Sequence, residues 1–398
     1  MKKVKSLILW MLVLLCVCSG YSVAEENGAV FTPSYGSPYA DTGSRGDYWT
    51  LPMDITDEEA VWDMLISPVT VVDNGKKNAE TEQIYLYGEP DENSMPVGVV
   101  TCLSQAVRVI ENAGNGWTLV ECYSSSFAGT SVPAWNVLVQ GYVRTSWLKT
   151  VKPDQTWGIV IDKLTQRLYI FMEGKLYSTL VVSTGKVVWN GEKYQPYNET
   201  RSGEFLLKSK VGGFKSDNMF CDKAIRFNKG DLLHEVPSVT YRDGSKDYST
   251  CEAKLGTKAS HGCIRVQRKR TPEGVNMSWI WNKVSGNKSN VKLVIWEDWQ
   301  GRQIAYPSDD LTLYYNPKGG SYYHSEETCY SATNITLTPF NYGELENAPF
   351  NKLKYCPFCA PAMRKAAIDE INEQYLPGGD HNPLLTELRQ EYFDRTAQ

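Results

Sequence analysis

One cysteine in a short glycine-containing turn carries the strongest chemical signal in the sequence. Residues 260–266 read Ser-His-Gly-Cys-Ile-Arg-Val, so Cys263 follows His261 by two residues and precedes Arg265 by two. A thiol is an effective nucleophile only as its thiolate, and an imidazole, a cation or backbone N–H donors lower its pKa. Gly262 also lets a substrate carbonyl approach the main chain. We therefore interpret Cys263 as a catalytic nucleophile.

A base for this thiol is expected nearby. The chain has only four histidines, and His234 lies upstream of Cys263 in Asp-Leu-Leu-His-Glu-Val. Cys-His catalysis needs an imidazole that is oriented by a third group, and a main-chain carbonyl can serve as that group. We predict that His234 is the base.

The elements that must position these residues are mostly strands. Apolar runs at 159–161, 168–171 and 176–182 are separated by polar turns, which predicts a meander that opens a β domain. The apolar run that ends at Trp296 supplies a further strand, and a helix is expected around 272–284. This domain, assigned to 153–299, contains both His234 and Cys263.

Together these segments resemble the YkuD-type L,D-transpeptidase family over about residues 155–297. The resemblance is carried by Ile-Val-Ile-Asp-Lys-Leu-Thr-Gln-Arg-Leu-Tyr-Ile-Phe at the start of the domain and by the Ser-His-Gly-Cys core. Residues 200–205 are similar to the Thr-Pro-Thr-Gly turn of the family, with Arg201 where proline is usual. We expect that departure to affect a turn and not the chemistry.

The resemblance implies a role for each residue of the motif. Cys263 would be the nucleophile and His234 the base, oriented by the carbonyl of the residue that follows it. Ser260, His261 and Gly262 would shape the side of the site that binds the oxyanion. Arg265 would hold a substrate carboxylate, with a buried ion pair as the open alternative. The spacer between His234 and Ser260 is longer than is common, which suggests an inserted loop over the active site.

The resemblance also implies the substrate class. The thiolate would attack a peptidoglycan tetrapeptide stem at its diamino acid, release D-Ala and leave a thioester, and an amine of a second stem would resolve it. No cofactor is expected for this exchange. The alternatives are an L,D-carboxypeptidase, a papain-like cysteine peptidase, which should carry its cysteine before its histidine, and a non-enzymatic protein that binds the cell wall.

A second β module is expected before the catalytic domain, which makes the predicted fold mainly β. Short apolar runs from 83 to 150, broken by turn residues, predict a small antiparallel barrel. The segments Gly-Asn-Gly-Trp-Thr-Leu-Val-Glu and Gly-Tyr-Val-Arg-Thr-Ser-Trp-Leu resemble a bacterial SH3 domain, assigned to 80–152. The larger catalytic domain is expected to be a β-sandwich. In the N-terminal extension, 25–79, Thr56 and Glu59 have the spacing of a capping box before a short helix.

The first 24 residues have the order of a secretory signal peptide, with lysines, an apolar run and small residues before Glu25. We therefore expect a secreted protein that is associated with the cell wall and has no membrane span after cleavage. The formal net charge is -5, so we exclude a protein that binds nucleic acid through a basic surface.

Export raises the question of how the cysteines are used. Cys221 with Cys251, and Cys102 with Cys122, are predicted disulfides. Near the C-terminus a His-x4-Cys pair and a Cys-x2-Cys pair form a ligand set for structural zinc, with a disulfide as the rival; these residues are His324, Cys329, Cys356 and Cys359. They belong to a small Cys/His knuckle at 306–363, which a charged helical tail at 364–398 follows.

Overall fold

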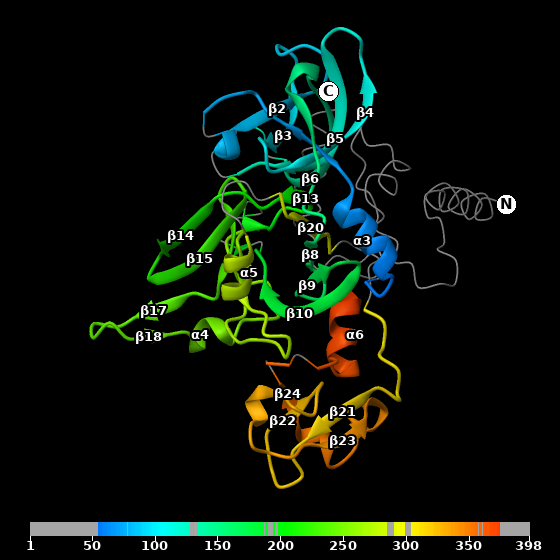
Figure 1. The fold of residues 1–398 in the computed structure, drawn as a ribbon, viewed down its shortest axis with the longest axis vertical. Helices are drawn as coiled ribbons and strands as arrows, with labels where there is room; N and C mark the ends of the chain where they lie inside the picture. The colour runs from blue at the N-terminus through cyan, green and yellow to red at the C-terminus, as the bar shows by residue number, and fades with distance from the viewer. Residues whose placement is uncertain are drawn as a thin grey trace, which may run out of the picture.

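The computed structural model describes residues 55–374, apart from residues 78, 128–131, 133, 187, 190–193, 196–197, 285–289, 299–303, 357 and 360. The predicted signal peptide and the end of the predicted tail lie outside these residues. Figure 1 shows three β units that follow one another along the long axis of the molecule. The mainly β fold expected from the sequence is confirmed.

The first unit is an antiparallel sheet in the order β3-β2-β6-β5-β4-β1-β7. It begins at Val69, so it includes a strand from the segment assigned to the N-terminal extension. Its apolar core contains Leu86, Val99, Val120 and Val139. The strands are β1 (Val69–Val72), β2 (Gln83–Tyr87), β3 (Pro96–Thr101), β4 (Ala106–Asn112), β5 (Trp117–Ser125), β6 (Trp135–Arg144) and β7 (Leu148–Val151).

One helix, α3 (Glu58–Ile66), precedes this sheet and packs against the second unit. Val61 and Leu65 are buried in a cluster with Val160 and Val294 of the larger sheet. The predicted helix is confirmed, but the predicted cap is wrong by one residue. Asp57 and not Thr56 is the N-cap, because the Asp57 carboxylate accepts a hydrogen bond from the Ala60 amide at 3.1 Å.

The second unit is a mixed sheet in the order β13-β20-β8-β9-β10-β19-β16-β15-β17-β18, with β14 paired to β15. Its pairs β20–β8 and β16–β19 are parallel. Side chains from both halves of the sheet meet in one core, including Ile159, Leu180, Ile225 and Leu233. The strands are β8 (Trp157–Asp162), β9 (Arg167–Met172), β10 (Lys175–Ser183), β13 (Gly203–Leu206), β14 (Lys210–Ser216), β15 (Met219–Asn228), β16 (Asp231–Glu235), β17 (Ser238–Thr240), β18 (Lys246–Asp247), β19 (Ile264–Val266) and β20 (Lys292–Trp296), with a separate hairpin of β11 (Val188–Trp189) and β12 (Tyr194–Gln195).

The predicted meander and the predicted helix of this unit are confirmed. Strands β8, β9 and β10 are consecutive antiparallel neighbours. Helix α5 (Met277–Lys283) is capped by Asn276 and buries Met277 and Ile280 in the core.

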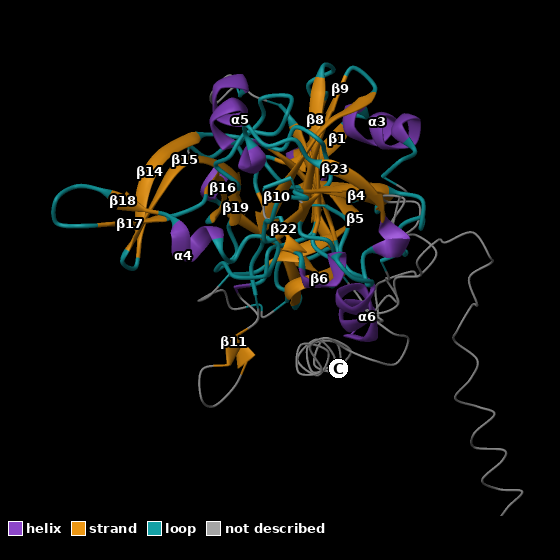
Figure 2. Cartoon of the chain, turned by 90° about the horizontal axis from the view of Figure 1, so that it is seen from below, coloured by secondary structure: helices purple, strands orange, loops and turns teal. Residues whose placement is uncertain are grey.

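The long spacer before Ser260 folds as secondary structure and not as a plain loop. It forms the β17–β18 hairpin and α4 (Ser249–Glu252), and the hairpin extends the sheet beyond β15. In Figures 1 and 2 this hairpin and the β14–β15 hairpin project from the same side of the molecule.

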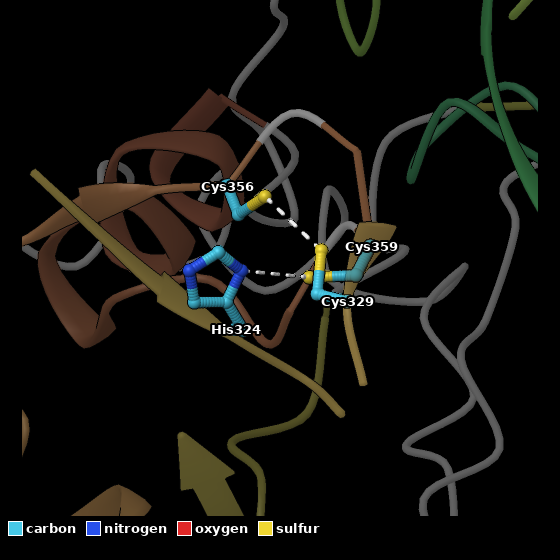
Figure 3. A group of neighbouring side chains, drawn as sticks. All are labelled: His324, Cys329, Cys356 and Cys359. Carbon is cyan, nitrogen blue, oxygen red and sulfur yellow. Dashed lines mark hydrogen bonds between the residues drawn. The ribbon is translucent and has the colours of Figure 1, made fainter. Parts of the chain in front are cut away.

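The third unit is a small sheet in the order β23-β21-β22-β24. Its strands are β21 (Thr312–Tyr315), β22 (Tyr322–His324), β23 (Thr338–Asn341) and β24 (Lys354–Tyr355), and α6 (Lys365–Gln374) follows. The four predicted metal ligands come together at one end of this sheet (Figure 3). Among the described residues, no helix has the length and apolar character needed to cross a membrane.

The two predicted disulfides are absent, because all eight cysteines in the described part of the chain are free. Cys102 and Cys122 are packed in the core of the first sheet as small apolar residues. The Cys251 thiol contacts the Met219 sulfur at 3.4 Å and is not bonded to Cys221.

Candidate active site

Two parallel strands bring the predicted nucleophile and base to one face of the large sheet. His234 on β16 is in register with Arg265 on β19, and Leu233 is in register with Ile264. Leu233 and Ile264 point into the core, so His234 and Arg265 point to the opposite face. Cys263 directly precedes β19, and the two-residue period puts its side chain on the face of His234.

His234 is held in one orientation by the backbone. Its Nδ1 lies 2.7 Å from the carbonyl oxygen of Glu235, which is the hydrogen bond that the family resemblance implies. The ring is buried and packs edge-on against Phe214, with 5.6 Å between centroids. Burial and the nearby Arg265 cation lower the pKa of His234 to about 4, against the effect of the Glu235 carbonyl. The imidazole is therefore neutral at neutral pH, with Nδ1–H donated to Glu235 and Nε2 left as the acceptor.

Cys263 is partly exposed. Its sulfur lies 3.8 Å from the carbonyl oxygen of Gly230. Desolvation and the Asp231 carboxylate raise the pKa of Cys263 to about 12, although the Leu232 backbone and Arg265 oppose the shift. At neutral pH Cys263 is therefore a thiol, and His234 on the same face is a neutral imidazole.

The turn before Cys263 is held together by Ser260. Its buried hydroxyl donates to the Cys263 carbonyl at 2.5 Å and accepts from the Gly262 amide at 3.2 Å. The hydroxyl predicted to bind substrate is therefore engaged within the turn, as is the Gly262 N–H. His261, by contrast, is exposed. The roles of these three residues toward substrate stay predictions.

The backbone conformation and the space at position 262 require glycine. Its φ is +115°, and a Cβ atom at this position would lie 2.3 Å from Oδ1 of Asp231. The Gly262 carbonyl accepts a hydrogen bond from the Thr200 hydroxyl at 2.7 Å. The Gly262 carbonyl and the Cys263 N–H belong to the same trans peptide, in which the C=O and N–H groups point in opposite directions. Because the carbonyl points toward Thr200, the Cys263 N–H points away from Thr200. That amide is the candidate donor to an oxyanion.

Arg201 and Asp231 support this turn, and sequence analysis missed both. The Arg201 guanidinium is fully buried and lies 3.3 Å from an Asp231 oxygen. Desolvation raises the pKa of Asp231 to about 6, although Arg201 and Asn228 oppose the shift. Arg201 lies in a turn, as expected, and its Nη1 would lie 3.3 Å from a Cβ atom at Gly262; that it leaves the chemistry unaffected stays a prediction. The unusual residue in the family's Thr-Pro-Thr-Gly position was the available signal.

Arg265 is buried beside both reacting groups. Its side chain is 6% exposed, and its charge acts on the pKa values of His234 and Cys263. In the described part of the chain no carboxylate forms an ion pair with it. The structural ion pair that sequence analysis left open is thus not found among these residues, and the role of Arg265 toward substrate stays a prediction.

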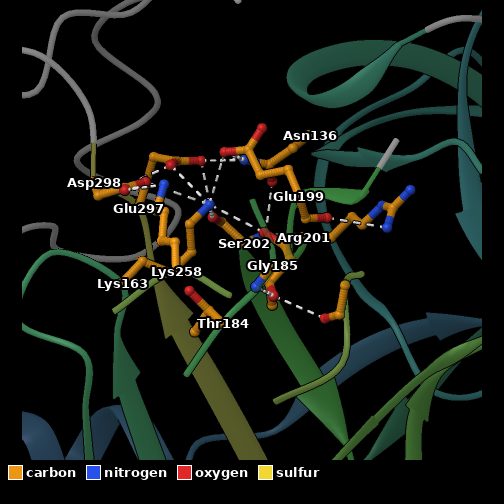
Figure 4. A network of polar contacts seen from close by, with 12 residues as sticks. Asn136, Lys163, Thr184, Gly185, Glu199, Arg201, Ser202, Lys258, Glu297 and Asp298 are labelled. Carbon is orange, nitrogen blue, oxygen red and sulfur yellow. Dashed lines mark hydrogen bonds and ion pairs between the residues drawn. The ribbon is translucent and has the colours of Figure 1, made fainter. Parts of the chain in front are cut away.

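A buried charge network underlies the turn that carries Thr200 and Arg201 (Figure 4). The Lys163 ammonium lies 3.0 Å from Glu199, 2.9 Å from Glu297 and 3.5 Å from Asp298. Although burial opposes its charge, these carboxylates raise the pKa of Lys163. Lys258 also binds Asp298. The three carboxylates are close enough to share a metal ion, but two lysines already compensate their charge.

The family model of the L,D-transpeptidase catalytic domain (YkuD) matches residues 156–295. A search of curated proteins found no match.

Solved structures with similarity to the chain include several L,D-transpeptidases. One from Xylanimonas cellulosilytica is 18% identical, with 35% of this chain and 60% of that chain covered and a TM-score of 0.24. One from Mycobacterium tuberculosis is 17% identical over 48% and 94%, with a TM-score of 0.26. The catalytic domain of the E. faecium enzyme is 18% identical over 35% and 95%, with a TM-score of 0.23.

Proposed function

We propose that this chain, whose residues 156–295 form an L,D-transpeptidase catalytic domain, is an exported peptidoglycan transpeptidase that links the diamino acids of two stem peptides. The observation that carries the proposal is the placement of Cys263 and of a backbone-oriented His234 on one face of two parallel strands. The family match supports the reaction class, and the signal-like N-terminus supports export.

The first half-reaction forms a thioester. The Cys263 sulfur attacks the carbonyl carbon between the diamino acid and the terminal D-Ala of a donor tetrapeptide, and the thiol proton moves to Nε2 of His234. The tetrahedral intermediate collapses with cleavage of the C–N bond, and the imidazolium returns the proton to the leaving amine of D-Ala. Because thiol and imidazole are both neutral at rest, proton transfer accompanies attack.

The second half-reaction exchanges one amide for another. The side-chain amine of a second stem attacks the thioester, His234 accepts its proton, and the C–S bond breaks. The proton then returns to the Cys263 sulfur. One peptide bond is broken and one amide is formed, so the balance requires no nucleotide or redox partner.

Arg265 is the residue proposed to recognise the donor. A tetrapeptide stem ends in a carboxylate next to the scissile bond, and a buried guanidinium can bind such a group through two parallel hydrogen bonds. Arg265 lies beside both His234 and Cys263. Binding of the carboxylate would compensate its charge and place the terminal D-Ala at the thiol.

Product analysis tests the proposed function. Purified protein and Cys263→Ala are incubated with disaccharide tetrapeptide, and the products are weighed by mass spectrometry. We expect a cross-linked dimer that has lost one D-Ala, formed by the wild type alone. A tripeptide without dimer would establish an L,D-carboxypeptidase instead. Unchanged substrate in both samples would favour the non-enzymatic wall-binding protein.

A further inference from the structure

We propose that His324, Cys329, Cys356 and Cys359 bind one structural zinc ion that fastens the C-terminal unit to the catalytic domain. The proposal does not depend on the transpeptidase reaction. Strands β22 and β24 are parallel, with Tyr323 in register with Tyr355. The next residues are His324, which ends β22, and Cys356, which directly follows β24, so the small sheet itself brings these two ligands together.

The distances between the donor atoms fit a metal centre and not a disulfide. The sulfurs of Cys329 and Cys356 are 3.9 Å apart, and the Cys359 sulfur lies 3.6 Å from Nδ1 of His324. All four donor atoms lie within 4.8 Å of one another (Figure 3). Tetrahedral Zn²⁺ with bonds of about 2.3 Å to sulfur and about 2.05 Å to nitrogen separates two sulfurs by about 3.8 Å and a sulfur from a nitrogen by about 3.6 Å.

The surroundings of the sulfurs suit thiolates. The Ser325 amide donates to Cys359 at 3.3 Å, and the Ser331 hydroxyl lies 3.1 Å from Cys329 and 3.2 Å from Cys356. Such donors orient and stabilise ligands in metal sites. Three thiolates and Zn²⁺ leave a net charge of about −1, and the Lys269 ammonium lies close by, over the ring of Phe358 at 3.5 Å.

The site also explains how a small unit is held in place. Phe358 lies between the ligands Cys356 and Cys359, and its partner Lys269 follows β19, which carries the end of the catalytic motif. Tyr355, next to Cys356, binds the Arg167 guanidinium at the start of β9. A metal ion that fixes Cys356 and Cys359 therefore fixes both contacts with the catalytic domain.

Metal analysis of the full-length protein tests the zinc site. We expect one zinc per chain in the wild type and in Cys251→Ser, which removes a free thiol outside the site, and a loss of that zinc in Cys356→Ser. His324→Cys preserves four ligands and should retain zinc, which separates ligand loss from misfolding. Wild-type protein purified without zinc, or Cys356→Ser that retains it, would overturn the proposal.

We infer, secondly, that Arg201 and Asp231 are positioning residues through which the N-terminal sheet supports the catalytic turn. This inference is independent of the zinc site and rests on the proposed function. The Arg201 guanidinium donates to the Ser126 carbonyl and stacks on the Phe127 ring at 4.0 Å. Both residues directly follow β5. The other end of the contact is Asp231, which fills the space beside Gly262.

The first unit also contacts the β15–β16 turn, from the end of β5 and from the start of β2. Asn228 donates to the Ser125 hydroxyl at 3.0 Å, and Lys229 donates to Gln83 at 2.6 Å. The Gly230 carbonyl oxygen in this turn lies 3.8 Å from the Cys263 sulfur. The N-terminal sheet thus contacts both Arg201 and the β15–β16 turn.

Acylation of Cys263 by a carbapenem, followed as one covalent adduct by intact mass, tests this inference. We expect Arg201→Met to slow acylation by about tenfold or more, since small displacements of a reacting group are costly, and Arg201→Lys to recover part of the rate. Glu204→Gln, which removes a buried ion pair with Lys292 away from the turn, should acylate like the wild type. Equal rates in folded Arg201→Met and wild type would reject the inference, whereas a wild type without any adduct would instead reject the proposed function.

Discussion

At the scale of single residues, the site is notable for two reacting groups that carry no charge at rest. Burial lowers the pKa of His234 to about 4, and burial with the Asp231 charge raises the pKa of Cys263 to about 12. A preformed thiolate–imidazolium pair would need the opposite shifts. Under the proposed function, the thiolate would therefore form only when the thiol proton moves to His234 during attack.

This pairing predicts the pH dependence of alkylation. A raised thiol pKa leaves little thiolate at neutral pH, and the thiolate fraction grows about tenfold per pH unit until the pKa is reached. The rate of Cys263 alkylation by iodoacetamide, measured by intact mass, should therefore rise steadily from pH 7 to pH 10. A rate that is constant across this range would indicate an ion pair and contradict the account.

The close contact beside Gly262 predicts that substitution of this glycine prevents acylation, whereas substitution of a glycine in open space does not. Gly262→Ala places a Cβ atom 2.3 Å from Asp231 and should abolish acylation of Cys263. Gly244→Ala is the matched control, since Gly244 also has a positive φ, +84°, but has no atom within 4 Å of its Cβ position. It should lose only about 1–2 kcal/mol of stability and retain its acylation rate. Equal behaviour of the two variants would contradict the close contact.

At the scale of elements, the parallel pairing of β16 and β19 places His234 and Cys263 on one face of the sheet. His234 and Cys263 belong to segments separated by the β17–β18 hairpin and α4, and only the ladder brings them together. The turn before β19 is hydrogen-bonded to Thr200 of the 199–202 turn. Arg201 of that same turn is in turn hydrogen-bonded to Ser126, which follows β5.

The cap of α3 offers a test at this scale. The Asp57 carboxylate accepts from the Ala60 amide, so Asp57→Ala should lower the free energy of unfolding by about 1 kcal/mol. Asp57→Asn, which keeps an acceptor oxygen, should change it little. Chemical denaturation of both variants measures the difference, and the cap assignment fails if alanine is as stable as asparagine.

The Lys163 network joins the end of β8, the 199–202 turn and the residues after β20. Lys163→Met leaves Glu199, Glu297 and Asp298 with less compensation in a buried site and should destabilise the protein by about 3–5 kcal/mol. Lys175→Met removes an exposed pair with Glu58 and should have little effect. Thermal unfolding compares the two, and similar melting temperatures would show that the network is not a structural requirement.

At the scale of the whole molecule, the first and third β units both contact the catalytic unit between them. The first contacts Arg201 through Phe127, and the third contacts Lys269, which follows β19, through Phe358; the three units follow one another along the molecule (Figure 1). If Arg201 is a positioning residue as inferred, loss of the N-terminal sheet should impair catalysis as well as stability.

Much of this arrangement was predictable from local sequence. The strands of the meander, α5 and the Ser-His-Gly-Cys turn are encoded by short contiguous patterns, and the scarcity of histidine singled out His234. The ligand set near the C-terminus was found in the same way, from spacing.

Contacts between distant segments were not predictable. In the sequence, Arg201 is only a residue that replaces the usual proline of a turn. Its contacts with Ser126 and Asp231 join distant segments and exist only in the folded chain. The disulfides predicted for Cys102 and Cys221 failed because buried thiols pack as readily as small apolar side chains, and sequence spacing carries no information about that choice.

The most direct test of the central claim is the mass of the intact protein after brief exposure to disaccharide tetrapeptide and rapid acid quenching. We predict an increase equal to the mass of the donor minus D-Ala, located on Cys263 by peptide mapping and absent from Cys263→Ala. Consumption of the donor without this adduct, or an adduct on another residue, would contradict nucleophilic catalysis by Cys263.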